Sequence, residues 1–308
     1  MRAQCISCDN ATLNPHGNHA NGACPSASSQ VHRRHAALQE ALLGAARMAG
    51  LTGEREPATA EVLEGQYSPA QCRALFPKTV TQAQRARISK LRQHLEKPPE
   101  PKSKEYQVWR DTSDMLTQEA TTGPDHVGRR VDLRITNEQQ EHRQEDLVDT
   151  SITHPSNKTN ITKSTTYAQL CLRKLLGRLD KKEHVPPNSP ALEKRAMEKI
   201  ETYSTLMMIT EKQYIEGRRL SKPVFVPAIA TTHGELGPDL IRFMERITAA
   251  YKFKMKQAPP RADGRGAKEL TTTFRRHLRE KVLMAVIKGT ARVLRSAGLG
   301  KLACRKYG

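Results

Sequence analysis

Two aspartates in short alternating segments have the residue type and the setting to bind a divalent metal ion. Asp132 lies in residues 129–136 and Asp149 in residues 147–153, and apolar and polar residues alternate through both segments. This period of two predicts strands with one buried and one solvent-facing side, and each solvent-facing side carries one aspartate. Carboxylates on adjacent strands can share a Mg²⁺ or Mn²⁺ ion, which can activate water for attack on a phosphodiester. The simpler interpretation is two solvated strand carboxylates.

A lysine and a tyrosine that can join this chemistry follow on the next predicted helix. Proline in its first turn predicts a helix over residues 190–208. Lys199 and Tyr203 share a face of this helix, because positions four apart are neighbours on a helix surface. Lys199 can therefore orient water or neutralise a phosphate, unless it is only a surface lysine above a half-buried tyrosine. Glu54 or Glu56, after the first predicted helix, can supply a third carboxylate.

The first 30 residues have the composition of a metal-stabilised segment. They are rich in Cys, His, Asn, Gly and Ser and hold almost no large apolar residues, so burial alone could not fold them. A bound Zn²⁺ ion can supply that stability. The predicted ligands are Cys5, Cys8, His19 and Cys24. His16 is an alternative to His19, and a cysteine-bearing tail without metal is the alternative to the whole site.

The net charge of the chain favours a polyanionic partner. Lys and Arg number 51 against 32 Asp and Glu, which gives a formal charge of +19 over 308 residues. Phosphate neutralisation gives affinity for nucleic acid without sequence readout, whereas the alternative is a charged, solvated helix face. The candidate nucleic-acid-binding residues are Arg33, Arg34, His35, Arg130, Arg275, Arg276 and Arg279.

Membrane and secreted proteins are disfavoured by the same composition. No run of about 18 apolar residues exists to span a membrane. The N-terminus lacks the apolar centre of a secretory signal. We therefore expect an intracellular protein that does not enter a membrane.

Helices and strands alternate along the chain, which indicates the α/β class. We expect helices at 31–49, 190–208, 238–256 and 270–297, and strands at 51–57, 129–136, 147–153 and 222–230. Two prolines in the last strand indicate an edge strand or a bulged one. Polar stretches at about 58–126 and 156–190 predict irregular insertions, the first partly disordered around one basic helical stretch. The expected units are a zinc-binding segment at 1–30, a main domain at 31–256, and a basic linker with a C-terminal helix at 257–308.

The order of these motifs resembles the C-terminal restriction-like endonuclease region of non-LTR retrotransposon proteins. That region has a Cys-Cys-His-Cys zinc knuckle, an Arg-His pair that begins a helix, a Glu-Pro pair, two aspartate-bearing strands, and a helix with Lys-x3-Tyr. The matching residues are Cys5/Cys8/His19/Cys24, Arg34-His35, Glu56-Pro57, Arg130-Val131-Asp132, Val148-Asp149-Thr150-Ser151-Ile152 and Lys199-x3-Tyr203. Phe225-Val226-Pro227 and Gly234-Glu235-Leu236-Gly237 also resemble the end of that region.

The resemblance implies a PD-(D/E)xK nuclease fold, a small mixed sheet flanked by helices. By this mapping Asp132 and Asp149 would hold Mg²⁺, with Glu56 as an accessory carboxylate. Ser151 stands where the general motif has its lysine, so Lys199 would be the catalytic lysine, with Tyr203 beside it. The Zn²⁺ ion would be structural. The implied partners are target DNA, element RNA and the upstream reverse transcriptase of full-length relatives, a domain absent from these 308 residues.

These observations favour a metal-dependent DNA endonuclease that nicks target DNA in the nucleus and so primes reverse transcription. The alternative is a catalytically inactive zinc-knuckle protein that binds DNA or RNA. A structural protein without a nucleic-acid role fits the charge poorly. The set of Asp132, Asp149 and Lys199 separates the first two hypotheses, because carboxylates facing a polyanion serve a nuclease but not a binder.

Overall fold

Four strands form the central sheet of the protein. A computed structural model describes residues 3–4, 12–13, 28–63, 67–77, 82–96, 98–100, 103–121, 131–138, 143–153, 189–258 and 266–296. The strands lie in the order β3 (Thr52–Arg55), β4 (Leu133–Asn137), β5 (Gln144–Thr153) and β6 (Lys222–Thr231). The first three are antiparallel, whereas β6 is parallel to β5. The predicted α/β class is confirmed, and the proline-bearing β6 lies at an edge as expected.

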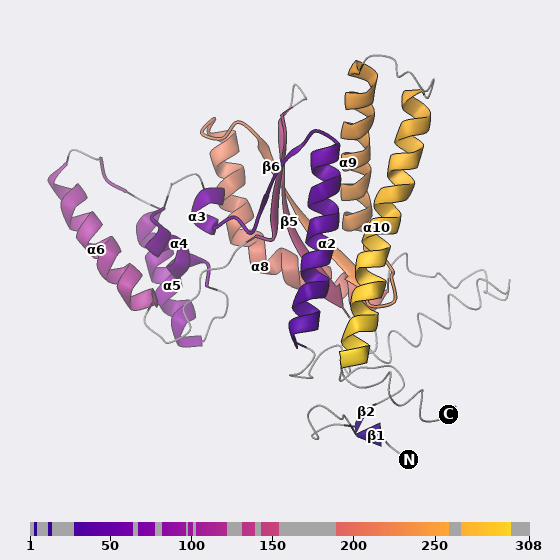
Figure 1. The fold of residues 1–308 in the computed structure, drawn as a ribbon. Helices are drawn as coiled ribbons and strands as arrows, with labels where there is room; N and C mark the ends of the chain where they lie inside the picture. The colour runs from indigo at the N-terminus through magenta and orange to yellow at the C-terminus, as the bar shows by residue number, and fades with distance from the viewer. Residues whose placement is uncertain are drawn as a thin grey trace, which may run out of the picture.

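One face of the sheet is covered by three long helices. They are α2 (Ser28–Met48), α9 (Pro238–Gln257) and α10 (Ala267–Ser296), which lie together on the right of the sheet in Figure 1. Their apolar stripes and the sheet form one core, which includes Leu38, Leu42, Leu133, Val148, Phe243 and Val286. Gly53 lets α2 lie close to β3, because a Cβ there would be 2.5 Å from Leu43 Cδ1.

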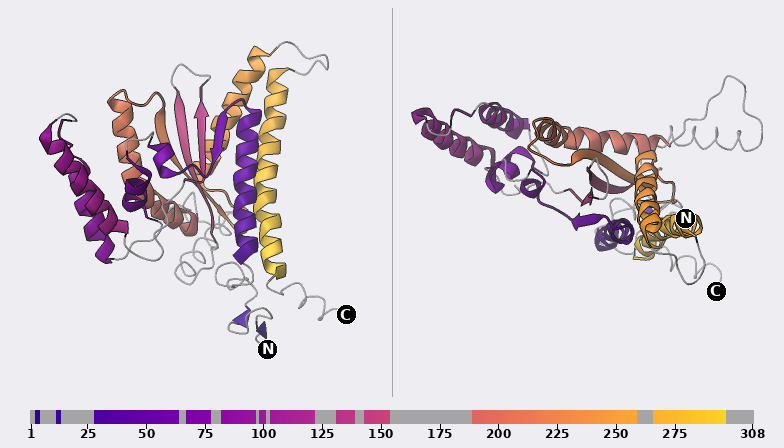
Figure 2. Two further views of the ribbon diagram at one scale, coloured as in Figure 1. Left: turned by 60° about the vertical axis from the view of Figure 1, so that its left-hand side comes forward. Right: turned by 90° about the horizontal axis from the view of Figure 1, so that it is seen from above.

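The other face is covered by α8 (Pro190–Ile215), beside which a group of shorter helices packs. These are α3 (Thr59–Val62), α4 (Pro69–Leu75), α5 (Gln82–Leu95) and α6 (Lys104–Thr121), seen to the left of the sheet in Figure 1 and at one end in Figure 2. A second core unites them with the sheet through Val62, Leu91, Leu116, Leu147 and Leu206.

The prediction of an irregular insertion over residues 58–126 is therefore wrong for its described part. Only the helix near residues 80–96, which is α5, was expected there. Each of these helices has few apolar residues, and they become buried only by packing against each other and against β5 and α8. Local periodicity does not show such shared burial.

Strand β5 is buried on both faces, although one face was expected to meet solvent. Val148 belongs to the first core and Leu147 to the second. Asp149 is 3% exposed and Ser151 is 7% exposed. The alternation of side chains is as predicted, but α8 covers the polar side.

The remaining described residues form a small antiparallel pair, β1 (Ala3–Gln4) and β2 (Thr12–Leu13). The predicted zinc ligands Cys5, Cys8, His19 and Cys24 lie outside the described residues, as does nearly all of the second predicted insertion at 156–190. Among the described helices, none combines the length and the hydropathy needed to cross a bilayer.

Candidate active site at the end of the central strands

Helix α8 places two basic side chains on the polar side of β5. Lys199 Nζ lies 2.7 Å from Asp149 Oδ2, and Arg195 Nε donates to Ser151 Oγ at 2.9 Å. The spacing matches because four helical residues rise about 6 Å and two strand residues about 6.6 Å. The pattern i, i+4 on the helix therefore pairs with i, i+2 on the strand.

Asp132 meets the same site from the residue before β4. Its Oδ2 accepts hydrogen bonds from Thr150 N at 2.6 Å and from Thr150 Oγ1 at 2.7 Å. The Asp132 and Asp149 carboxyl groups also interact, since each shifts the pKa of the other. The two aspartates predicted from separate strands are thus brought together.

His35 completes this cluster from the second turn of α2. Its Nε2 lies 3.2 Å from Asp132 Oδ2, 2.8 Å from Thr150 Oγ1 and 2.9 Å from Thr150 O. Burial opposes the charged form of His35, but the Asp132 carboxylate outweighs it and raises the pKa of the ring above its usual value. His35 was predicted to bind nucleic acid, whereas the structure places it against a proposed metal-binding carboxylate.

The two aspartates have opposite pKa shifts. Burial favours the neutral form of Asp132. The hydrogen bond and positive charge of His35, together with the hydrogen bond of Thr150, nevertheless lower the pKa of Asp132 to about 2. Burial raises the pKa of Asp149 to about 6, and the Asp132 carboxylate adds to this while Lys199 opposes it. Shifts of this kind mark a pair in which one carboxyl group holds its proton more strongly than the other.

The two carboxylates of the cluster suit a hard divalent cation that takes only one or two ligands from the protein. Mg²⁺ is commonly held by one or two carboxylates, with water or phosphate oxygens as its other ligands. Asp132 and Asp149 supply two carboxylates that are close enough to share a proton or an ion. Within the described ranges, no group of three or more His, Cys, Asp or Glu residues is arranged to hold a metal. A soft metal with several protein ligands is therefore a poor fit to this cluster.

Two other predicted catalytic residues are placed differently. Glu56 is exposed, with φ of 50°, and its backbone N–H donates to Asp132 O at 2.8 Å. Glu54, the alternative accessory carboxylate, contacts Arg134 at 3.9 Å instead. Tyr203 is 5% exposed, and its ring lies 4.9 Å from that of Phe225 in the second core. The ring of Tyr203 thus supports α8 by packing in the second core.

The candidate nucleic-acid-binding residues separate into exposed and buried ones. Arg33 is exposed on α2, and Arg275, Arg276 and Arg279 are exposed on α10. Arg34 was expected at the surface, but it is 3% exposed and donates to Thr290 Oγ1 at 3.1 Å. It occupies the space that a Cβ at Gly289 would fill, 2.4 Å from Arg34 Cγ. Arg130 lies outside the described residues.

A basic groove of about 440 Å³ runs along the surface where α2 and α10 meet. Its exposed basic side chains outnumber its acidic one, Glu40. They are Arg33, Lys281, Lys288 and Arg292. Arg33 of this groove precedes His35 of the candidate cluster by two residues on α2.

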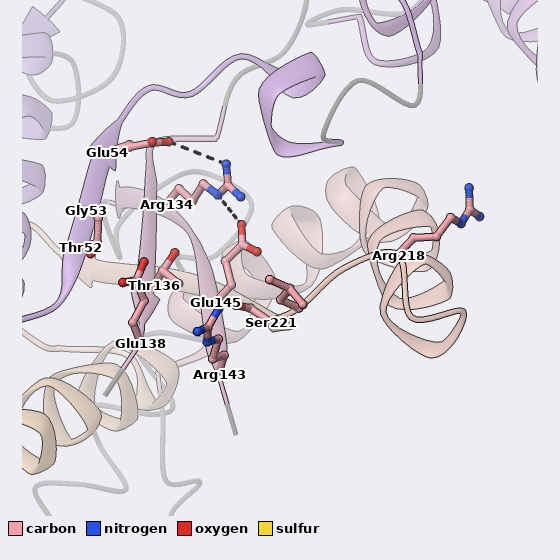
Figure 3. Close-up of a pocket in the computed structure, with 11 residues that line it drawn as sticks. Thr52, Gly53, Glu54, Arg134, Thr136, Glu138, Arg143, Glu145, Arg218 and Ser221 are labelled. Carbon is pink, nitrogen blue, oxygen red and sulfur yellow. Dashed lines mark hydrogen bonds and ion pairs between the residues drawn. The ribbon is translucent and has the colours of Figure 1, made fainter. Parts of the chain in front are cut away.

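A second charged cluster occupies the opposite end of β5. Glu145 accepts from Arg134 Nε at 2.6 Å and from Arg219 Nε at 2.9 Å, and its side chain is 1% exposed. Figure 3 shows Arg134 between Glu54 and Glu145 in a cavity of about 410 Å³. Its lining combines arginines and carboxylates, so it is a poor receptor for a purely anionic ligand.

Thr150 and Arg195 belong to the candidate site, but no role was predicted for them from the sequence. Thr150 lies in the matched strand motif, but alternation assigned it to the buried face. Arg195 precedes Lys199 by four residues, which was a usable signal for a shared helix face. Comparison with known protein families, with curated proteins and with solved structures found no match to this chain.

Proposed function

We propose that this protein is a metal-dependent DNA endonuclease that nicks target DNA by phosphodiester hydrolysis, as in the restriction-like endonuclease region of non-LTR retrotransposons. One observation carries the proposal. Asp132, Asp149 and Lys199 come from three separate segments, next to β4, in β5 and in α8, and meet in one cluster, with 2.7 Å between Lys199 Nζ and Asp149 Oδ2. The order of the sequence motifs predicts the same three residues as the metal ligands and the catalytic lysine.

Asp132 and Asp149 would hold the Mg²⁺ or Mn²⁺ ion in this proposal. When bound, the ion supplies an activated water and stabilises charge on the phosphate. Lys199 neutralises Asp149 in the metal-free protein and remains within reach of a phosphate oxygen that enters the site. Arg195 has 39% of its side chain exposed, so its guanidinium can bind a phosphate beside Ser151.

The groove between α2 and α10 would bind the DNA backbone. Arg33, Lys281, Lys288 and Arg292 offer positive charge there without base-reading geometry, which suits binding of any sequence. Zn²⁺ at Cys5, Cys8, His19 and Cys24, element RNA as a second partner and action in the nucleus belong to the same proposal through the resemblance alone.

Nicking of supercoiled plasmid tests the catalytic part. The wild-type protein should nick with Mg²⁺ or Mn²⁺ and not with EDTA, and Asp132→Ala and Asp149→Ala should each abolish nicking. Asp146→Asn is the matched control, because Asp146 lies on the same strand but pairs with Arg246 on the opposite face. Nicking that survives both alanine substitutions would overturn the proposed site.

Plasmid binding at several salt concentrations tests the groove. Replacing Lys288 and Arg292 with Gln should weaken binding and reduce the slope of log affinity against log salt by about one for each phosphate that the protein no longer neutralises. Lys256→Gln on α9 is the control, because Lys256 is exposed but lies outside the groove. An unchanged slope would place the DNA on another surface.

A second candidate function, nucleic-acid binding without cleavage, is favoured by one specific observation. Lys199 already balances the charge of Asp149, so the cluster does not require a metal ion to be stable. Metal-dependent nicking that Asp132→Ala and Asp149→Ala abolish would exclude this candidate. Equal plasmid binding without nicking in wild type and both variants would establish it.

A further inference from the structure

A line of hydrogen bonds leads from β3 through α2 to the active-site cluster. Arg55 Nε donates to Gln39 Oε1 at 3.1 Å, and Gln39 Nε2 lies 3.2 Å from His35 Nδ1. His35 Nε2 then contacts Thr150 and Asp132. Gln39 is 1% exposed, so water cannot easily replace either of its partners. Neither Gln39 nor Arg55 has a role in the proposed nuclease function.

The direction of these hydrogen bonds is fixed by the chemistry of arginine. A guanidinium can only donate, so Arg55 requires the oxygen of the Gln39 amide to face it. The amide nitrogen must then face His35, and because it also only donates, Nδ1 must accept. A neutral imidazole that accepts at Nδ1 carries its proton on Nε2. The ring nitrogen nearest to Asp132 is therefore the protonated one.

Packing of α2 on β3 makes this arrangement possible. His35, Gln39 and Leu43 follow each other at intervals of four on one helix face, and Gly53 and Arg55 lie two apart on one strand face. Since Gly53 has no side chain, Leu43 can lie against it, which brings Gln39 to Arg55 one turn earlier.

The donors around Asp132 converge on one of its two carboxylate oxygens. Thr150 N, Thr150 Oγ1 and His35 Nε2 all approach Oδ2, at 2.6, 2.7 and 3.2 Å. A carboxylate held in this way cannot rotate about its Cβ–Cγ bond without breaking all of these contacts. Oδ1 is then the oxygen that is presented to a ligand.

We propose that Gln39, oriented by Arg55, is a positioning residue that keeps the proton of His35 on Nε2, and that His35 thereby fixes Asp132 with Oδ1 directed toward the bound cation. The cation part of this inference rests on the proposed function. The tautomer part concerns the metal-free protein and stands independently of it. Residues that orient metal ligands in this way commonly change metal affinity by roughly 10- to 100-fold when they are replaced.

Nitrogen-15 NMR of the histidine rings in the metal-free protein tests the tautomer, above the raised pKa of His35. Wild-type His35 should carry its proton on Nε2 and none on Nδ1. Gln39→Glu should add a proton at Nδ1, because the new carboxylate accepts from Nδ1–H while Nε2 still faces the acceptors Asp132 Oδ2 and Thr150 O. Arg55→Met frees the amide to turn and should increase the share of Nδ1–H. A wild-type proton on Nδ1, or an unchanged ring in both variants, would overturn the proposal.

Arg47→Met is the matched control for Arg55→Met. Arg47 also joins α2 to β3, through a hydrogen bond of 3.4 Å to Gly53 O, but it does not contact Gln39. The Arg47→Met substitution should therefore leave the His35 tautomer unchanged. Arg55 is exposed, so its replacement should leave the fold intact even if the buried Gln39→Glu change does not.

Calorimetric titration with Mn²⁺, without DNA, tests the effect on Asp132. Arg55→Met and Gln39→Glu should weaken Mn²⁺ binding by roughly tenfold or more, whereas Arg47→Met should not. Unchanged affinity in both variants would refute the orientation of Asp132. The expected tautomers in a protein that neither binds Mn²⁺ nor nicks plasmid would refute the nuclease function but leave the positioning of His35 intact.

Discussion

Two carboxylates buried on β5 are surrounded by different sets of charged side chains. Glu145 and Asp149 lie four residues apart on the same side of this strand, and both are almost fully buried. Glu145 receives two arginines, Arg134 and Arg219, and the latter also donates to Val62 O at 2.8 Å. Asp149 instead has one lysine and a second carboxylate, that of Asp132.

The difference lies in the balance of charge. At Glu145, the nearest partners carry more positive than negative charge, and each is tied to neighbouring backbone or side-chain groups. At Asp149, two carboxylates face one lysine, and His35 adds a positive charge only below its pKa. A cluster with this deficit of positive charge favours an added cation or proton, which is why we place the chemistry at Asp149 and a structural role at Glu145.

The largest expected effect is a loss of stability from Glu145→Gln. This change leaves Arg219 buried without its carboxylate, which should lower the free energy of unfolding by about 3–5 kcal/mol. Urea denaturation followed by circular dichroism measures it. Glu138→Gln, at an exposed acid near the same end of the sheet, should change stability by less than about 0.5 kcal/mol. Similar values for both variants would remove the distinction between the two ends.

The next effect concerns stability against pH and the raised pKa of Asp149. The folded protein holds this proton up to about pH 6, whereas the unfolded chain releases it near 3.8, so stability falls as pH rises through that window. The fall is at most about 3 kcal/mol, since each pKa unit is about 1.4 kcal/mol. Asp149→Asn should abolish it.

Asp132 should cause a second change in stability with pH, at lower pH than that of Asp149. The pKa of Asp132 is lowered to about 2, whereas that of Asp149 is raised. The contribution of Asp132 to stability is therefore present above about pH 4 and is lost as the pH falls toward 2. Denaturation curves between pH 2 and 8 should therefore retain the acid-side loss in Asp149→Asn. A wild-type curve that rises steadily from pH 4 to 6 would contradict the assignment of the pair.

Lys199→Met should destabilise the protein only where Asp149 is ionised. At pH 8, the substitution leaves the buried Asp149 carboxylate without its lysine partner, which should lower the free energy of unfolding by about 1–3 kcal/mol. At pH 5, Asp149 is protonated, and the loss should be close to zero. Glu145→Gln should be destabilising at both values, so the two ends differ in pH dependence as well as in size. Equal losses at pH 5 and pH 8 in Lys199→Met would contradict this.

The smallest effect on stability is expected from Arg195→Ala. This arginine is partly exposed and pairs with Glu198 as well as Ser151, so its loss should cost less than about 1 kcal/mol. Its effect on DNA binding should be larger than that of Arg242→Ala, which breaks a similar surface pair with Asp239 on α9. Equal DNA affinities in the two variants, measured by fluorescence anisotropy, would exclude Arg195 from the substrate site.

The sequence predicted the strands best where burial follows a simple alternation. The expected strand at 147–153 is part of β5, but the strand begins earlier, at Gln144. Glu145 and Asp146 argue against a buried strand on composition alone. Arg219 and Arg246, which come from distant segments, neutralise them and so allow the strand to extend.

Long-range packing also explains the residues whose settings were predicted wrongly. Arg34 enters the helix interface because Gly289, 255 positions away, leaves room for it. His35 meets Thr150 across 115 positions. Neither environment can be predicted from residues near the side chain in sequence, because each is created by the approach of another element.

The family resemblance singled out Asp132, Asp149 and Lys199 as candidate site residues. The sequence by itself determined the α/β order of elements, the edge position of the proline-bearing strand and the net charge. These follow from composition and from periodicities of two and 3.6, which are local properties of the chain. The tertiary structure decided which charges are buried, which oxygen of Asp132 is held, and that Gln39 and Arg55 stand behind His35. Burial and hydrogen-bond direction depend on elements that meet only when the chain folds.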